Sequence, residues 1–241
     1  MLKVNNISFS YPNGCKGVFD ISFNLEKGKI LAVLGNNGSG KTTLLNLLSG
    51  NFSADSGEIL INGENIKKIL RLQLSKTIAV VPQFFNISSI NVRDFIGLGL
   101  VWQFKKFQLT HTKEQKKQIE EIIEITGLSD LANEPLNKIS GGERQIAKIA
   151  QALVKKPEIL LFDEPISHLD LSNSSKVLSL IKDICRNENV CAVIILHDIY
   201  SVRKFADFVL MLKQGKQFGY CEINNFSDKN ISDLFSINYN N

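Results

Sequence analysis

The chain has 241 residues, of which 44% are hydrophobic and 22% are charged, the balance of an ordinary globular protein. Its formal net charge of +4, from 28 Lys and Arg against 24 Asp and Glu, is mild and evenly scattered, which argues against nucleic acid as the main partner. The longest clean apolar run, residues 190–196, is far shorter than the ~20 residues that span a bilayer. We therefore expect a cytoplasmic protein that meets any membrane through a partner.

The first sixty-odd residues predict β-strands. In residues 18–25, apolar side chains at every second position alternate with Asp20, Ser22 and Asn24, which is typical of a half-buried strand. Residues 58–61, followed by Asn62 and Gly63, predict a strand that enters a tight turn.

Three further apolar runs are short, continuous and rich in β-branched residues: 30–34, 159–162 and 190–196. Such runs suit strands buried on both faces of a mostly parallel sheet. Between them, residues 112–126 place Ile119, Ile122, Ile123 and Thr126 on one helical face among Lys and Glu. This helix and its neighbours, from about residue 84, predict a helical insert in an α/β core, and residues 209–218 predict a closing hairpin.

The strongest chemical signal is a glycine-rich loop that matches G-x-x-x-x-G-K-[ST], here called the P-loop. Its residues, with the Thr that follows, are Gly35, Asn36, Asn37, Gly38, Ser39, Gly40, Lys41, Thr42 and Thr43. Backbone N–H groups in such a loop close around phosphate oxygens at a helix N-terminus. Lys41 would supply charge for the β- and γ-phosphates and Thr42 a hydroxyl for Mg²⁺. A Gly-rich turn would match by accident in roughly 1% of chains of this length.

A second signal is the apolar run 159–162, which ends in Asp163 and Glu164. Ligands of open α/β sheets bind at the carboxyl ends of strands. Asp163 would hold Mg²⁺, and Glu164 would polarise an attacking water. Acids that merely cap the next helix are the alternative, which the P-loop makes the weaker one.

Ser140, Gly141 and Gly142 open an amphipathic segment and predict a second anion-binding helix start. A flexible helix entry is the alternative for this motif taken alone. With the P-loop and the Asp163–Glu164 pair, however, the chain resembles an ABC ATPase over nearly its whole length. The resemblance implies that residues 140–142 are the signature loop, which contacts the γ-phosphate of ATP held by a second copy in a head-to-tail dimer. The usual signature begins with Leu and often continues to Gln, where this chain has Ile139 and Glu143, and a position that is often Arg is Ile146.

The same resemblance assigns four further residues. Tyr11 matches the aromatic that stacks on adenine, and Gln83 the glutamine that touches Mg²⁺ and senses the nucleotide. Asp170 lies in the loop 167–170, through which the two ATP sites communicate. His197 matches the histidine that contacts the γ-phosphate and the catalytic glutamate. Taken alone, Tyr11 and His197 would be ordinary structural residues; among the other histidines, we expect His111 on the surface and no catalytic role for His168.

The implied fold is α/β: a P-loop NTPase core with a mostly parallel sheet, an N-terminal antiparallel β subdomain and an inserted α-helical subdomain. We expect a single ABC ATPase domain over residues 1–241. Residues 1–83 and 157–241 would form the core with the β subdomain, and about 84–156 the helical insert with the signature loop. ATP and Mg²⁺ are the implied cofactors.

The implied role is that of the ATP-hydrolysing motor of a transporter at the cytoplasmic face of the cell membrane. Its partners would be a second copy, integral-membrane permease subunits and a separate solute-binding protein, with no nucleic acid. The motifs at 91–94, 140–145 and 167–170 are similar to those of importers of ferric siderophores, haem and cobalamin, although an Arg and a Pro that often follow near Gly99 are replaced here by other residues. Another ABC transporter, a soluble non-transport ABC ATPase and a module that binds ATP without hydrolysing it remain alternatives.

Two groups of side chains carry further predictions. The segment from Gln83 to the signature loop is rich in large aromatics, and in the resembling family a groove here receives a helix of the permease. Many of these side chains would pack the helical insert, and those that are exposed would anchor the contact with the permease. The set comprises Phe84, Phe85, Phe95, Trp102, Phe104 and Phe107. The four cysteines show neither redox nor metal-ligand spacing and are predicted to be buried or incidental thiols of a reducing compartment: Cys15, Cys185, Cys191 and Cys221.

Overall fold

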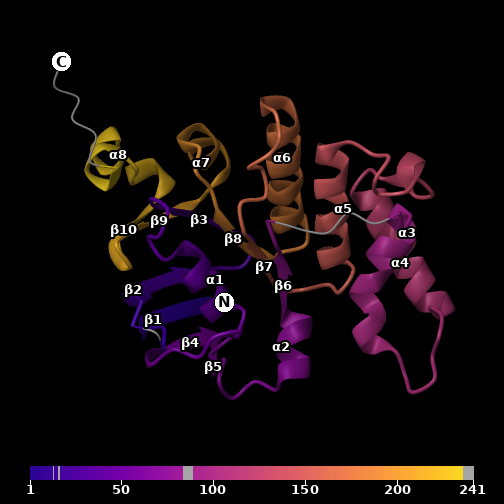
Figure 1. Cartoon of the computed structure of the whole chain (residues 1–241), viewed down its shortest axis with the longest axis horizontal. Coiled ribbons are helices and arrows are strands. Elements are labelled where there is room, and N and C mark those ends of the chain that lie inside the picture. The colour runs from indigo at the N-terminus through magenta and orange to yellow at the C-terminus, as the bar shows by residue number, and fades with distance from the viewer. Residues whose placement is uncertain (13, 16, 84–88, 236–241) are drawn as a thin grey trace.

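The computed structural model describes residues 1–12, 14–15, 17–83 and 89–235, and these residues build one mixed sheet with helices on both faces (Figure 1). Within them the sheet has ten strands in the order β5-β4-β1-β2-β10-β9-β3-β8-β7-β6. The strands are β1 (Leu2–Phe9), β2 (Val18–Leu25), β3 (Ile30–Leu34), β4 (Ser56–Ile61), β5 (Glu64–Asn65), β6 (Ile78–Val81), β7 (Ile159–Phe162), β8 (Cys191–Ile195), β9 (Phe208–Lys213) and β10 (Lys216–Glu222).

The helices flank this sheet and extend beyond its β6 edge. The α-helices are α1 (Lys41–Leu48), α2 (Arg71–Thr77), α3 (Val92–Gly97), α4 (Lys113–Ile125), α5 (Gly141–Leu153), α6 (Leu171–Asn187), α7 (Ile199–Phe205) and α8 (Asp228–Phe235). The 3-10 helices of the described residues are η1 (Leu98–Gln103), η2 (Ser129–Leu131) and η3 (Ile223–Asn225). Helices α3, α4 and α5 gather at the end of the molecule next to β6 (Figure 1). None of the helices among the described residues is both long enough and apolar enough to cross a bilayer.

The sheet has a parallel part and an antiparallel part. Strands β9, β3, β8, β7 and β6 pair in parallel, whereas β1 pairs antiparallel with β2 and with β4. The two parts join at one parallel pair, Lys216 opposite Phe19, between β10 and β2. The predicted fold is therefore confirmed, with the antiparallel strands continuing the core sheet. The predicted bounds of the helical insert stay a prediction.

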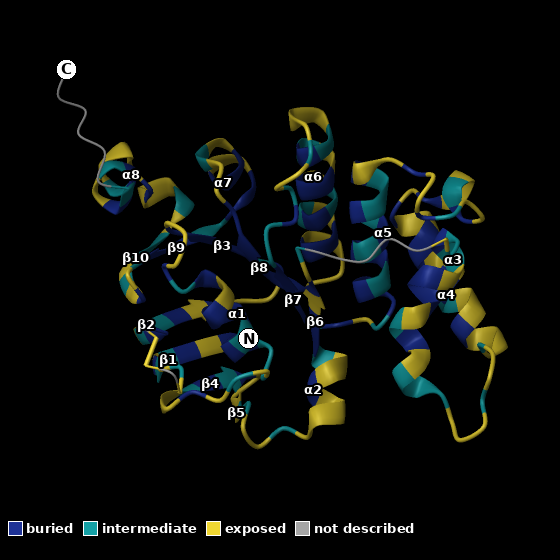
Figure 2. Cartoon of the chain, in the orientation of Figure 1, coloured by how far each residue is buried: buried dark blue, intermediate teal, exposed yellow. Residues whose placement is uncertain are grey.

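The central strands are buried on both faces because their alternate residues enter two different cores. In β3, Ala32 and Leu34 pack with α5, α6 and α7, whereas Leu31 and Val33 pack with α1 and the antiparallel strands. Figure 2 shows these strands as the continuous buried layer between the helices. Period-two alternation is lost when both faces are covered, which is why the continuous apolar run 30–34 predicted this strand correctly.

Capping residues explain where α4 and α5 begin. Thr112 and Gln115 form a capping box at α4, as Ser140 and Glu143 do at α5. Each box pairs backbone N–H groups at the helix start that have no partner within the helix. The helix predicted at residues 112–126 is confirmed, because α4 runs between those two residues as caps.

The structure separates the buried from the exposed members of the aromatic set. Phe95 is 2% exposed and packs in the core, so it is not one of the exposed members that could meet a partner. His111, expected on the surface, is half-buried, with Nε2 3.0 Å from the carbonyl oxygen of Gly97. Phe107 is 88% exposed, as the prediction requires, and Phe84 and Phe85 lie outside the described residues.

Candidate active site

The P-loop connects the end of β3 to the start of α1, and its glycines are required by its shape. A Cβ on Gly35 would lie 2.3 Å from the carbonyl oxygen of Leu212, which leaves no room for a side chain. Gly40 has a φ of 101°, in the left-handed region that glycine tolerates without strain. These positions let the backbone turn tightly between the strand and the helix.

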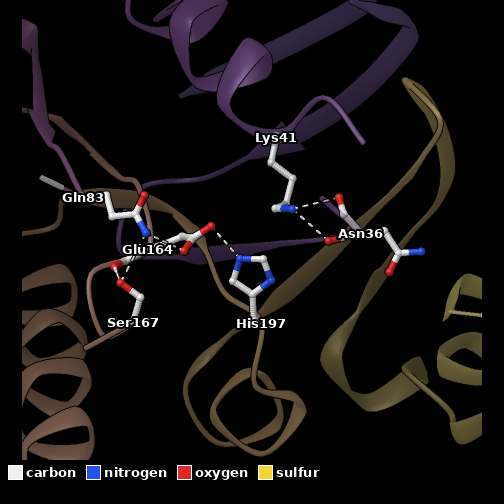
Figure 3. Close-up of polar contacts among 7 residues, drawn as sticks. Asn36, Lys41, Gln83, Glu164, Ser167 and His197 are labelled. Atoms are coloured by element: carbon white, nitrogen blue, oxygen red, sulfur yellow. Dashed lines mark hydrogen bonds and ion pairs between the residues drawn. The ribbon is translucent and has the colours of Figure 1, made fainter. Parts of the chain in front are cut away.

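Lys41 lies inside this loop. Its ammonium donates to the carbonyl oxygens of Gly35 at 2.8 Å and Asn36 at 3.1 Å, and the residue is only 6% exposed (Figure 3). Burial lowers the pKa of Lys41, while the charges of Glu164 and Asp163 act in the opposite direction. The cation is therefore desolvated beside two carboxylates, where a phosphate can be bound with high electrostatic gain.

Three side chains converge because of the order of the strands. Gln83, Glu164 and His197 each stand two residues beyond the end of β6, β7 and β8, which are neighbours in the sheet and run parallel. Nε2 of Gln83 donates to one carboxylate oxygen of Glu164 at 2.9 Å. Nε2 of His197 is 2.6 Å from the other carboxylate oxygen of Glu164 and donates to it (Figure 3).

Glu164 also has an unusual backbone, with a φ of 49°. A non-glycine residue in this left-handed region costs free energy and is held there by its surroundings, as is common at functional sites. A carboxylate fixed by two hydrogen bonds in this way can orient a water molecule and accept its proton.

Asp163 lies next to this network and is half-buried. Burial raises the pKa of Asp163, and so does the negative charge of Glu164, while Lys41 and His197 partly offset the rise. A cation beside such a carboxylate would stabilise its ionised form. No cluster of three or more His, Cys, Asp or Glu residues suited to a metal exists within residues 1–12, 14–15, 17–83 and 89–235. A single carboxylate and the hydroxyl of Thr42 fit Mg²⁺, which keeps few protein ligands when it binds together with phosphates.

The P-loop itself offers a further sign that it accommodates an anion. The hydroxyl of Ser39 is buried, and within the described part of the chain it has no hydrogen-bond partner. A buried hydroxyl is rarely left unpaired, so a bound phosphate oxygen would satisfy it. The P-loop residues therefore fit a nucleotide phosphate.

Tyr11 forms part of an aromatic cluster beside α1. Its ring meets Phe9 edge-on at 5.1 Å between centroids, and Phe52 at 5.8 Å. Its hydroxyl is 2.9 Å from Oγ1 of Thr43, so ring and hydroxyl are both held. The half-buried ring can provide an apolar face near the P-loop helix.

The signature loop lies at a different place, at the start of α5. Ser140 caps this helix, and the backbone N–H of Ser140 donates to Glu143 at 2.7 Å. Hydrogen bonds from the Ser140 side chain and backbone lower the pKa of Glu143. A Cβ on Gly142 would lie 3.0 Å from the Asn173 side chain, so the loop packs closely against the start of α6, which Asp170 caps.

The sequence profile of the family described as ABC transporter matches residues 18–167. The chain belongs to the ABC transporter family. It is 33% identical to the phosphonates import ATP-binding protein of Treponema denticola, over 90% of this chain and 87% of that protein. It is also 33% identical to the methionine import ATP-binding protein of Helicobacter hepaticus, over 89% of this chain and 61% of that protein.

Solved structures agree with this family. An inward-facing ABC transporter assigned to the metal-chelate type matches with a TM-score of 0.85 and 31% identity, over 98% of this chain and 88% of that one. A dimeric ATP-binding cassette in a post-hydrolysis state, bound to ADP and Pi, matches with a TM-score of 0.78 and 26% identity, over 94% of this chain and 100% of that one. ATP-binding domains of the ABC family hydrolyse ATP, dimerise and pair with membrane permease subunits, and this chain is an ATP-hydrolysing member.

Within this ABC ATPase, the structure gathers the predicted residues into two groups. Lys41, Gln83, Glu164 and His197 lie around one site, whereas the signature loop and Asp170 lie at the starts of α5 and α6, where Gly141 shares a cleft with Gln83 and Glu164. Roles for individual residues stay predictions.

Sequence reasoning missed two contacts at this site. Oγ of Ser167 lies 3.5 Å from Nε2 of Gln83, and the ammonium of Lys148 approaches the backbone at Gln83. The sequence did contain a sign that Lys148 is unusual, because this lysine stands between Ala147 and Ile149 in an otherwise apolar stretch of a predicted helix.

Proposed function

We propose that the chain binds Mg·ATP at the P-loop and hydrolyses it with Glu164 as the general base. The observation that supports this most is the position of Glu164, held between Gln83 and His197 beside the buried ammonium of Lys41. Glu164 accepts the proton of the attacking water, and His197 fixes the carboxylate. Lys41 and the P-loop amides, from Gly35 to Thr43, stabilise the negative charge of the phosphates.

Mg²⁺ would be held by Thr42, Gln83 and Asp163 and would neutralise charge on the phosphates when bound. The chain's own contribution is to keep Asp163 beside the P-loop at the end of a buried strand. Tyr11 would stack on the adenine. Comparing the ATP affinity of Asp163→Asn with and without Mg²⁺ tests the metal ligand, since the variant should lose the gain in affinity that Mg²⁺ provides.

The working unit would be a head-to-tail dimer, in which Ser140, Gly141 and Gly142 of one copy complete the ATP site of the other, with Asp170 at the contact. Ser140 and Gly141 are exposed, and a Cβ on Gly141 would meet, among the described residues, only the side chains of Leu169 and Arg144 within 4 Å, so both residues are accessible to a second copy. The dimeric cassette structure among the relatives supports the arrangement.

Mixing two inactive variants tests this dimer. Lys41→Ala damages the P-loop and Ser140→Arg blocks the signature loop, so each homodimer has two broken sites. A head-to-tail heterodimer has one site with both parts intact, and the mixture should regain ATPase activity. A mixture that stays as inactive as its components contradicts a composite site.

We further propose that the chain drives import of a metal chelate, such as an iron chelate, haem or cobalamin, at the cytoplasmic face of the membrane. A permease and a separate solute-binding protein would complete the system. The likeness to the metal-chelate type transporter supports this substrate class. The phosphonates import relative favours phosphonates as the second candidate. Purifying the permease complex and identifying the solute it binds decides between them.

The permease contact is expected on the exposed aromatic side chains that follow Gln83. Phe107 is 88% exposed, whereas Trp102 and Phe104 are half-buried. Phe107→Glu should retain basal ATPase activity and lose both permease binding and its stimulation of hydrolysis. Phe218→Glu, at a 42% exposed position of β10, is the matched control and should still bind the permease. Normal permease binding by folded Phe107→Glu places the contact elsewhere.

A further inference from the structure

Lys148 lies in the middle of α5, the helix that begins at the signature loop. Its side chain is half-buried, and its ammonium is 3.3 Å from the carbonyl oxygen of Pro82 and 3.4 Å from that of Gln83. Burial lowers the pKa of Lys148. A cation withdrawn from water in this way needs hydrogen-bond acceptors, and the two backbone carbonyls supply them.

These two carbonyls stand where β6 ends and the active site begins. Pro82 directly follows β6, and the side chain of Gln83 donates to Glu164 at 2.9 Å. Gln83 therefore links α5 to the proposed general base: its backbone carbonyl accepts from Lys148, and its side chain donates to Glu164. His197 contacts the other carboxylate oxygen of Glu164.

The same residues share one cleft. Lys148, Gln83 and Glu164 line a cavity of about 260 Å³, together with Gly141 and Arg144 from the first turns of α5. The guanidinium of Arg144 is already bound to the carbonyl oxygen of Ile139 at 2.9 Å. Lys148 is thus the cation of this cleft that contacts the backbone carrying Gln83.

We propose that Lys148 is a positioning residue for hydrolysis, which ties the signature helix to the Gln83 backbone and so holds the Gln83 side chain against Glu164. The inference rests on the proposed roles of Gln83 and Glu164. A displacement of α5 relative to the sheet would reach Glu164 through this contact. Because the contact acts on the Gln83 side chain and not on the P-loop, its loss slows the chemical step and weakens ATP binding only through the Mg²⁺ that Gln83 would share with Thr42 and Asp163.

The test measures kcat and KM for ATP in Lys148→Met and Lys148→Arg, each in the wild-type and in a Gln83→Ala background. Lys148→Met keeps the apolar stem and removes the donor, and kcat should fall roughly tenfold, the effect of one lost charge-assisted hydrogen bond. KM should stay within about twofold, and Lys148→Arg should recover most of the activity. Lys155→Met is the matched control, because burial also lowers the pKa of Lys155 just beyond the end of α5.

The Gln83→Ala background distinguishes positioning from general damage. This variant keeps the backbone carbonyl that Lys148 contacts and removes the side chain that reaches Glu164. Lys148→Met should then cause no further loss of kcat, since the link to Glu164 is already broken. Equal losses in both backgrounds, or an unchanged kcat in Lys148→Met, overturn the proposal.

Two further measurements distinguish the loss of positioning by Lys148 from loss of folding and from failure of the proposed function. Thermal unfolding of each variant identifies loss of folding, and Lys148→Gln replaces Lys148→Met if that variant does not fold. Glu164→Gln is assayed in parallel. If it hydrolyses ATP at the wild-type rate, the proposed function itself fails; if it is inactive while Lys148→Met is fully active, only the role of Lys148 fails.

Discussion

Glu164→Gln is the sharpest perturbation of this active site, because glutamine has nearly the shape of glutamate and can keep both of its hydrogen bonds. A glutamine keeps one oxygen to accept from Nε2 of Gln83, now at 2.9 Å from a carboxylate oxygen. Its amide can donate to Nε2 of His197, at present 2.6 Å away, if the neutral imidazole adopts the tautomer whose Nε2 accepts. Both hydrogen bonds survive, and what disappears is the ability to accept a proton.

The expected loss of rate is that of the general base alone, because the hydrogen bonds are kept. A positioned general base contributes about 10²–10⁴ in rate, which corresponds to roughly 3–5 kcal/mol of barrier at 1.36 kcal/mol for each tenfold. Lys41 and the P-loop are untouched, so the affinity for ATP should stay within a few-fold of wild type. With ATP bound and uncleaved, the variant should accumulate as a dimer.

Single-turnover cleavage of radiolabelled ATP measures the chemical step, and equilibrium binding of ATP measures affinity. Glu158→Gln is the matched control, since Glu158 directly precedes β7 as Glu164 follows it and forms an exposed ion pair with Lys27. The control should hydrolyse ATP normally. Cleavage by Glu164→Gln within about threefold of wild type would refute the assignment of Glu164 as the base.

Tyr11, Asp163 and the cysteines each allow a further test. Tyr11→Ala should weaken ATP binding by about 1–3 kcal/mol through lost stacking, whereas Tyr11→Phe, which loses only the bond to Thr43, should bind ATP more like wild type in a titration. The pKa of Asp163 is raised in the folded chain, so the folded chain binds this proton more tightly than the unfolded chain, and ionisation of Asp163 lowers stability as pH rises. Asp163→Asn should therefore raise Tm at pH 7 without nucleotide. An unchanged or lower Tm speaks against this. Burial raises the pKa of Cys185 to about 12, so this thiol should resist iodoacetamide at pH 8 in the native protein, while the exposed Cys15 is alkylated, as mass spectrometry can show.

The sequence alone predicted the motifs that are built from consecutive residues. The P-loop, the strand that ends in Asp163 and Glu164, and the helix start at Ser140 each lie in one short stretch, because a phosphate loop or a strand end is built from consecutive residues. The continuous apolar run 30–34 likewise predicted a strand buried on both faces, which the two cores confirm. Placement of Gln83 and His197 with Glu164 was expected only through the family resemblance, since nothing in their local sequence indicates proximity.

What only the tertiary structure decided are the contacts between residues distant in sequence. The parallel order β8-β7-β6 brings His197, Glu164 and Gln83 to one edge, and residues 33 to 81 positions apart then become hydrogen-bond partners. Lys148 occupies a helical position whose orientation toward Pro82 and Gln83 depends on how α5 packs against β6, which no local pattern encodes. Burial of Phe95 and the single pair that joins the two parts of the sheet were likewise settled by packing, because periodicity reports which face of an element is apolar but not what covers it.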